Sequence, residues 1–142
     1  MKCKHVTLNS RPPTCQFSVP PAVLKVLIVD DYEIGSDALS AYLGLENMEC
    51  RTAVSGYAAL EMDATWLPHI ILMDISMPEL GGVETAQAVR GTPNGKCVII
   101  IAFTALNWTD VERIANGGEF DGYWQKGQPI DLLTQFVLRS VT

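Results

Sequence analysis

Short apolar runs of strand length constrain the fold of this chain most strongly. Three of them, residues 26–29, 70–73 and 98–103, consist almost entirely of Val, Ile, Leu and other apolar residues. Such unbroken runs are typical of strands covered on both faces, as in a parallel sheet between two layers of helices. Between the runs, apolar residues recur at helical spacing, for example at Ile34, Ala38 and Tyr42. The pattern therefore predicts alternating strands and helices.

The expected elements form five strand–helix units. The strands are predicted at residues 23–29, 50–54, 69–73, 96–103 and 120–125, and the helices at 31–47, 55–66, 83–90, 109–116 and 130–141. Ser55 is the expected N-cap of the second helix. Because parallel crossovers are right-handed, few topologies remain. We expect one α/β domain with a doubly wound, five-stranded parallel sheet and helices on both faces.

The first 22 residues lack apolar periodicity and contain Pro12-Pro13 and Pro20-Pro21. This composition predicts a flexible N-terminal leader at residues 1–22, dispensable for folding, and a domain at residues 23–142.

The charge distribution excludes several partners. Residues 1–22 carry +3 (Lys2, Lys4 and Arg11, with no acid), so the rest of a chain of net charge −6 carries −9. A domain that acidic repels phosphate backbones, which argues against nucleic acid binding and favours a divalent cation or a basic partner surface. No apolar stretch approaches the ~20 residues of a membrane span, and no secretory signal is evident. We therefore expect a cytoplasmic protein with no membrane contact.

The four cysteines are Cys3, Cys15, Cys50 and Cys97. Their spacing fits neither a zinc site nor a C-x-x-C redox motif. Cys50 and Cys97 stand beside predicted strands, where we expect buried thiols that behave as small apolar residues.

Polar side chains end four of the predicted strands. The first strand runs into Asp30-Asp31 and the third into Asp74, while the fourth ends on Thr104 and the fifth on Lys126. In a doubly wound sheet these carboxyl ends form the ligand site. Clustered carboxylates repel one another unless a cation such as Mg²⁺ offsets their charge. A carboxylate can attack phosphorus, and a lysine can neutralise a phosphoryl oxygen. The set indicates Mg²⁺-assisted phosphoryl transfer.

Taken singly, each residue has a plainer interpretation. Asp30 and Asp31 could cap the following helix, where acids favour the helix dipole. Asp74 could be a loop acid, Thr104 a strand-end cap and Lys126 a solvated charge. Their joint occurrence at four strand ends favours the site.

Four segments carry a resemblance to a known family: 27–31 (LIVDD), 73–82 (MDISMPELGG), 103–105 (FTA) and 123–126 (YWQK). In order, spacing and context they resemble the receiver domain of two-component response regulators over residues 23–142. The resemblance implies a flavodoxin-like fold with strand order 2-1-3-4-5. It implies that Asp74 is the phosphoacceptor and that Asp31 ligates Mg²⁺ directly and Asp30 mainly through water.

The resemblance also implies roles for five further positions. The backbone carbonyl of Ser76 is a further expected Mg²⁺ ligand, and Thr104 and Lys126 are expected to hold the phosphoryl group. Ala105 leaves room for the phosphoryl donor, and Tyr123 stands at the position of the family's switch aromatic. We expect Thr104 to sense the phosphoryl group and to draw the following loop inward, so that Tyr123 turns from exposed to buried. The alternative is that Tyr123 is a strand aromatic packed in place. The expected donor is the phosphohistidine of a sensor histidine kinase or a histidine phosphotransfer protein. The last two helices and the fifth strand would form the face for an output partner or a second copy.

One segment departs from the family pattern. The family usually has proline directly after the lysine, often through a cis peptide, whereas here the order is Lys126-Gly127-Gln128-Pro129. Gly127 can supply an unusual backbone conformation instead. Either the loop still directs Lys126 inward, or the site is weakened.

Two alternatives stand beside the switch function, in which the chain is a signalling phosphoacceptor and no turnover enzyme. One is a pseudo-receiver, a binding module that is not phosphorylated. The other is an aspartyl-phosphate hydrolase of the haloacid dehalogenase type, although Ser76 occupies the second Asp position of that motif. The sequence is compatible with a stand-alone receiver and with a receiver module of a hybrid kinase or longer regulator.

Overall fold

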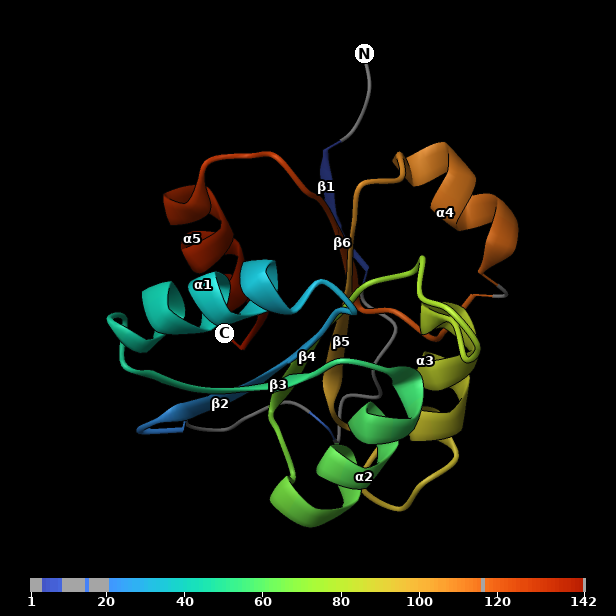
Figure 1. Cartoon of the computed structure of the whole chain (residues 1–142), viewed down its shortest axis with the longest axis horizontal. Helices are drawn as coiled ribbons and strands as arrows, with labels where there is room; N and C mark the ends of the chain where they lie inside the picture. The colour runs from blue at the N-terminus through green and yellow to red at the C-terminus, as the bar shows by residue number, and fades with distance from the viewer. Residues whose placement is uncertain (1–3, 9–14, 16–20, 116, 142) are drawn as a thin grey trace.

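A six-stranded sheet between two layers of helices forms the body of the molecule (Figure 1). The computed structural model describes residues 4–8, 15, 21–115 and 117–141. Its elements, in chain order, are β1 (His5–Thr7), β2 (Leu24–Val29), α1 (Glu33–Gly44), β3 (Met48–Ala53), α2 (Gly56–Trp66), β4 (Ile70–Met73), α3 (Gly82–Arg90), β5 (Ile99–Thr104), α4 (Trp108–Ile114), β6 (Gly122–Gln125) and α5 (Ile130–Ser140). All five predicted strand–helix units are present, with ends shifted by a few residues.

The order of the strands is β1-β6-β5-β4-β2-β3, and every pair except β1–β6 is parallel. Counted from β2, the five parallel strands therefore have the predicted order 2-1-3-4-5. This is the flavodoxin-like topology, and its switch point lies between β2 and β4, where the carboxyl ends of strands form a ligand site.

Alternation along each strand divides the core between the two faces. On one face Val29, Met73 and Ala102 pack with buried residues of α2, α3 and α4. On the other face Ile28 and Ile101 pack with buried residues of α1 and α5. Figure 1 shows the same division, with α1 and α5 on one side of the sheet and α2, α3 and α4 on the other. Both faces of the central strands are buried, which explains their unbroken apolar runs.

The prediction of a flexible leader at residues 1–22 is wrong for residues that the structure describes. His5, Val6 and Thr7 form β1, which pairs antiparallel with β6 and extends the sheet by one strand. The His5 ring also stacks on Trp124, with ring centroids 5.4 Å apart. Because a three-residue strand is too short to show an apolar period, its pairing left no signal in the sequence. Of the Pro-Pro segments, the structure describes only Pro21.

The prediction for Cys97 is also wrong. Cys97 is bonded to Cys15, 82 residues earlier, with an S–S distance of 2.05 Å. Cys15 is 8% exposed, so this part of the leader is fixed against the domain. Cys50 fits the prediction, since it is a free, partly buried thiol packed against the core. Burial, followed by the nearby charge of Glu49, raises the pKa of Cys50 to about 11, which keeps it unreactive.

No helix in the described ranges is both long and apolar enough to span a bilayer.

Candidate phosphoacceptor site

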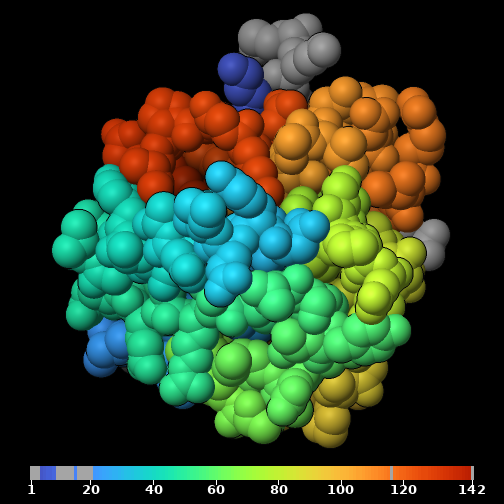
Figure 2. All heavy atoms as spheres, viewed as in Figure 1, coloured from blue at the N-terminus to red at the C-terminus, as the bar shows by residue number. Residues whose placement is uncertain are grey.

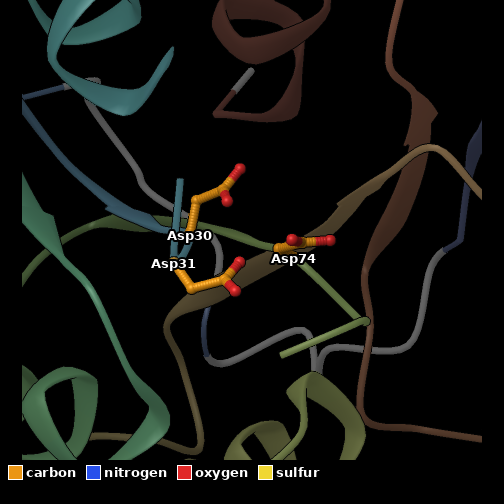
Figure 3. A group of neighbouring side chains, drawn as sticks. All are labelled: Asp30, Asp31 and Asp74. Atoms are coloured by element: carbon orange, nitrogen blue, oxygen red, sulfur yellow. The ribbon is translucent and has the colours of Figure 1, made fainter. Parts of the chain in front are cut away.

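Three aspartates lie together at the carboxyl ends of β2 and β4 (Figure 3). Each can offer a carboxylate oxygen such that all three oxygens lie within 4.8 Å of one another. Asp30 and Asp74 are buried, with 5% and 6% of their surfaces exposed, whereas Asp31 is exposed. The structure thus brings together the acidic residues that the sequence predicted.

Backbone hydrogen bonds fix the two buried aspartates. The Asp30 N–H donates to the Ala53 carbonyl at 3.0 Å, and the Asp74 N–H donates to the Val29 carbonyl at 2.9 Å. These bonds continue the sheet by one residue beyond each strand. The backbone of both aspartates is therefore held rigidly at the edge of the sheet, as a site with a fixed geometry requires.

The interpretation of Asp30 and Asp31 as helix caps does not hold. Tyr32 is the N-cap of α1, and no side chain caps it. Asp30 Oδ1 instead accepts a hydrogen bond from the Tyr32 N–H at 2.9 Å. This local bond turns the chain before the helix starts, which is why α1 begins at Glu33 rather than at the predicted residue 31.

A close approach of α3 shapes the loop after Asp74. The Gly82 N–H donates to the Ile75 carbonyl at 3.1 Å. A Cβ atom at Gly82 would lie 2.1 Å from the Asp74 carbonyl oxygen, so only glycine fits there. The Ser76 N–H donates to Asp74 Oδ1, with 3.4 Å between nitrogen and oxygen, so the loop folds back over the carboxylate.

Lys126 reaches the aspartates despite the altered loop that follows it. Its Nζ lies 2.5 Å from Asp30 Oδ2 and 3.6 Å from Asp74 Oδ2. Its backbone N–H donates to the Thr104 carbonyl at 2.8 Å, which ties the end of β6 to the end of β5. Of the two outcomes that the sequence left open, the structure shows an inward-directed lysine. Its ammonium offsets part of the negative charge of the cluster.

Burial raises the pKa of Asp74 above its ordinary value. Lys126 is the next largest influence and lowers the pKa, while the charge of Asp30 raises it again. Since burial prevails over Lys126, an ionised Asp74 is the costly form, and a bound cation would favour it.

Thr104 ends β5 beside the aspartates. It stands two residues after Ala102, the register partner of Met73, and is 1% exposed. Its Oγ1 lies 3.3 Å from the Leu106 N–H, from which it accepts a hydrogen bond. Ala105, the next residue, is exposed.

Tyr123 is fully buried, at 0% exposure, and its hydroxyl donates to the Leu106 carbonyl at 2.6 Å. Its ring lies 5.3 Å from that of Trp108, between centroids. The expectation that Tyr123 starts from an exposed position is therefore wrong. Leu106 instead joins the two predicted switch residues, because its N–H contacts Thr104 and its carbonyl contacts Tyr123.

The donor set suits a hard divalent cation. The cluster offers carboxylate oxygens alone, with no histidine or cysteine among its members. Mg²⁺ prefers such oxygens, usually one or two carboxylates together with water or phosphate oxygens. When bound, it would supply positive charge next to the acceptor oxygen and the phosphoryl group. Asp30, Asp31 and Asp74 are the residues that would hold it.

We expect that Asp31→Asn weakens Mg²⁺ binding about tenfold or more, since the loss of one ligand charge typically costs over 1 kcal/mol. The stability of the metal-free protein should stay equal or rise. Asp31 caps no helix, and its neutralisation removes its repulsion of the two remaining aspartates. Titration calorimetry with Mg²⁺ and thermal unfolding in EDTA check both statements. Mg²⁺ should raise the melting temperature of the wild type more than that of the variant. A clear loss of stability in EDTA would contradict this assignment.

Sequence reasoning missed two residues around the site, Gln125 and Gln128. Gln125 Nε2 donates to the Ala105 carbonyl at 3.2 Å, and Gln128 Nε2 donates to the Lys4 carbonyl at 2.8 Å. The two extra residues after Lys126 distinguished this loop in the sequence, but the sequence did not identify the carbonyl groups that the two glutamines contact.

Comparison with known proteins identifies the family of this chain. The family model described as the response regulator receiver domain matches residues 26–137. Response regulator PleD of Caulobacter vibrioides is 36% identical over 83 residues, covering 58% of this chain and 18% of PleD. The polar-differentiation response regulator DivK of Brucella ovis is 32% identical over 94 residues, covering 66% of this chain and 76% of DivK. The chain thus spans less than a fifth of PleD but most of DivK.

Solved structures show the same fold. Chemotaxis protein CheY4 of Vibrio cholerae superposes with a TM-score of 0.78 at 26% identity, over 83% of this chain and 98% of CheY4. Response regulator TrrA of Thermotoga maritima, solved in complex with Mg²⁺ and BeF, gives a TM-score of 0.72 at 28% identity, over 82% of this chain and 97% of TrrA. With the family match covering most of its length, the chain belongs to the response regulator receiver domain family.

Proposed function

We propose that this receiver domain accepts a phosphoryl group on Asp74 from the phosphohistidine of a sensor histidine kinase or a histidine phosphotransfer protein, with Mg²⁺ as the cofactor. The observation that carries the proposal is the position of Lys126, whose ammonium lies beside Asp30 and Asp74. A phosphoryl group on Asp74 would place its oxygens next to that charge.

The transfer needs few groups. An oxygen of the Asp74 carboxylate attacks phosphorus, the bond between phosphorus and the imidazole nitrogen breaks, and the electron pair leaves with the imidazole. Lys126 neutralises a phosphoryl oxygen, and the Thr104 hydroxyl can donate to another. The product is an acyl phosphate. The domain thereby acts as a cytoplasmic signalling switch and has no metabolite of its own to turn over.

The contacts of Lys126 favour this proposal over a pseudo-receiver. The altered loop after Lys126 is the feature that supports a pseudo-receiver, yet the lysine reaches the acidic cluster. The hydrolase alternative lacks support as well, because Ser76 supplies no second carboxylate after Asp74.

The direct test is incubation of the wild type with acetyl phosphate, followed by intact mass spectrometry and peptide mapping. We expect one phosphoryl group, on Asp74, in Mg²⁺ and none in EDTA. Equal labelling in EDTA, or labelling at another residue, would overturn the proposal. Steady hydrolysis of a generic phosphate ester would favour the hydrolase instead.

Output requires an element with two arrangements. The proposed element is the loop at residues 105–107, since Leu106 contacts both Thr104 and Tyr123. When Thr104 Oγ1 turns to a phosphoryl oxygen, its bond with the Leu106 N–H changes, and the Tyr123 hydroxyl must follow the Leu106 carbonyl. The face of α4, β6 and α5 would then change shape for a partner or a second copy.

We expect that Thr104→Ala is still phosphorylated on Asp74 but loses the phosphorylation-dependent change in partner binding or self-association. The reason is that alanine has no hydroxyl to sense the phosphoryl oxygen. Sedimentation or binding measurements with and without phosphorylation check this. Thr65→Ala, at an exposed position on α2 outside that face, is the matched control. An unchanged switch in Thr104→Ala would remove Thr104 from the sensing role.

A further inference from the structure

The connection from β6 to α5 carries a second set of contacts that the family pattern does not explain. Gly127 and Gln128 stand between Lys126 and Pro129. Gly127 has φ of +100°, a conformation that favours glycine. The chain therefore turns sharply just after the lysine that must reach the aspartates.

The Gln128 side chain closes this turn. Its Nε2 donates to the Gln125 carbonyl at 2.9 Å and to the Lys4 carbonyl at 2.8 Å. A carboxamide nitrogen carries two hydrogens, so both are used. One bond spans Lys126 within the loop, and the other joins the loop to the N-terminal strand.

The Lys4 carbonyl is a shared anchor. It also accepts the Gln125 N–H at 2.7 Å, at the end of the β1–β6 ladder. The residue just before Lys126 and the residue two after it are thus tied to one oxygen atom. On the opposite side, Gln125 Nε2 holds the Ala105 carbonyl at 3.2 Å. Figure 2 shows the blue residues of β1 against the red surface that leads into α5, beside the orange surface of α4.

These anchors matter because of what Lys126 has to do. Its side chain is long and 29% exposed, and its ammonium contacts Asp30 and Asp74 from a loop rather than from a strand. A lysine on an unrestrained loop would spend part of its time in solvent. A restrained backbone on both sides keeps the ammonium at the carboxylates without adding a group to the site itself.

We propose that Gln128 is a positioning residue for Lys126 and that β1, through the Lys4 carbonyl, completes its support. The inference rests on the proposed phosphoacceptor function and deepens it. In this proposal the N-terminal strand contributes indirectly to phosphorylation, and the two extra residues after Lys126 help to hold the lysine in position.

The test compares Gln128→Ala with the wild type in the rate of phosphorylation by acetyl phosphate. We expect a rate about three- to tenfold lower, the range for losing one or two modest hydrogen bonds. Mg²⁺ affinity should stay within about twofold, because the Gln128 side chain donates to the Gln125 and Lys4 carbonyls rather than to the aspartates. Amide exchange at Lys126 should become faster. Gln135→Ala, on the surface of α5, is the matched control and should leave the rate unchanged.

A double-variant cycle separates positioning from a general structural role. If Gln128 acts through Lys126, adding Gln128→Ala to Lys126→Ala should slow phosphorylation no further. Additive losses, or a wild-type rate in Gln128→Ala, would overturn the inference while the proposed function stands. Absence of Mg²⁺-dependent phosphorylation in the wild type would overturn both.

Discussion

Asp74→Asn is expected to abolish phosphorylation while it raises the free energy of unfolding of the metal-free protein. The amide removes the nucleophilic oxygen, so no acyl phosphate forms. It also removes a charge that burial makes costly, as the raised pKa of Asp74 indicates. Opposite effects on activity and stability are typical of residues retained for function.

The effect on stability should depend on pH with a definite sign. A carboxyl whose pKa is raised in the folded state binds its proton more tightly there than in the unfolded chain. Its protonation therefore stabilises the fold below the ordinary pKa of 3.8, and that contribution is lost as pH rises through the folded-state pKa. The advantage of Asp74→Asn should be absent in acid and full at neutral pH.

Chemical denaturation in EDTA at a series of pH values checks this prediction. Asp37→Asn, on the exposed surface of α1, is the matched control and should change neither stability nor phosphorylation appreciably. A less stable Asp74→Asn at neutral pH would mean that the contact of Lys126 with Asp74 outweighs the cost of burial.

Loss of the Cys15–Cys97 bond is expected to lower the free energy of unfolding by about 2–5 kcal/mol, because a crosslink across 82 residues restricts the unfolded chain strongly. Cys15→Ala, Cys97→Ala and the double variant should lose similar amounts. Denaturation under oxidising conditions measures the loss.

Reduction supplies the control. The wild type in dithiothreitol should fall to nearly the stability of the double variant, which itself should not respond to reductant. Cys50→Ala, which removes the free thiol, should keep the full response. If the wild type and the double variant were equally stable under oxidising conditions, the bond would contribute nothing to the fold.

The sequence by itself determined the five parallel strands and the residues at their carboxyl ends. Unbroken apolar runs predict central strands, because only strands buried on both faces need them. Right-handed crossovers then leave few topologies, and the resemblance to receiver domains implies the order that β2 to β6 adopt. The carboxyl ends of parallel strands lie at the same edge of a sheet, so the residues that follow those ends are expected close together. These residues are Asp30, Asp31, Asp74 and Thr104. Their positions could be predicted because strand pattern and topology can both be inferred from the sequence.

Tertiary structure alone decided the contacts between distant segments. Lys126 and Asp30 are 96 residues apart, and they meet beside a turn at Gly127 that a hydrogen bond of the Gln128 side chain closes. The partly buried ion pair between Arg90 Nη2 and Asp121 Oδ2, 2.8 Å apart, had no local signal either. The fold of the backbone decides which distant side chains meet, and the periodicity of the sequence carries no information about such pairs.

The N-terminal segment shows the same limit most clearly. β1 is stabilised by backbone hydrogen bonds to the edge of β6, and every backbone offers such groups regardless of its side chains. The pairing of Cys15 with Cys97 likewise depends on the distance between their Cα atoms, 5.0 Å in the fold. Composition predicted a loose leader because it records side chains, whereas the free edge of β6 and the position of Cys97 exist only once the sheet has formed.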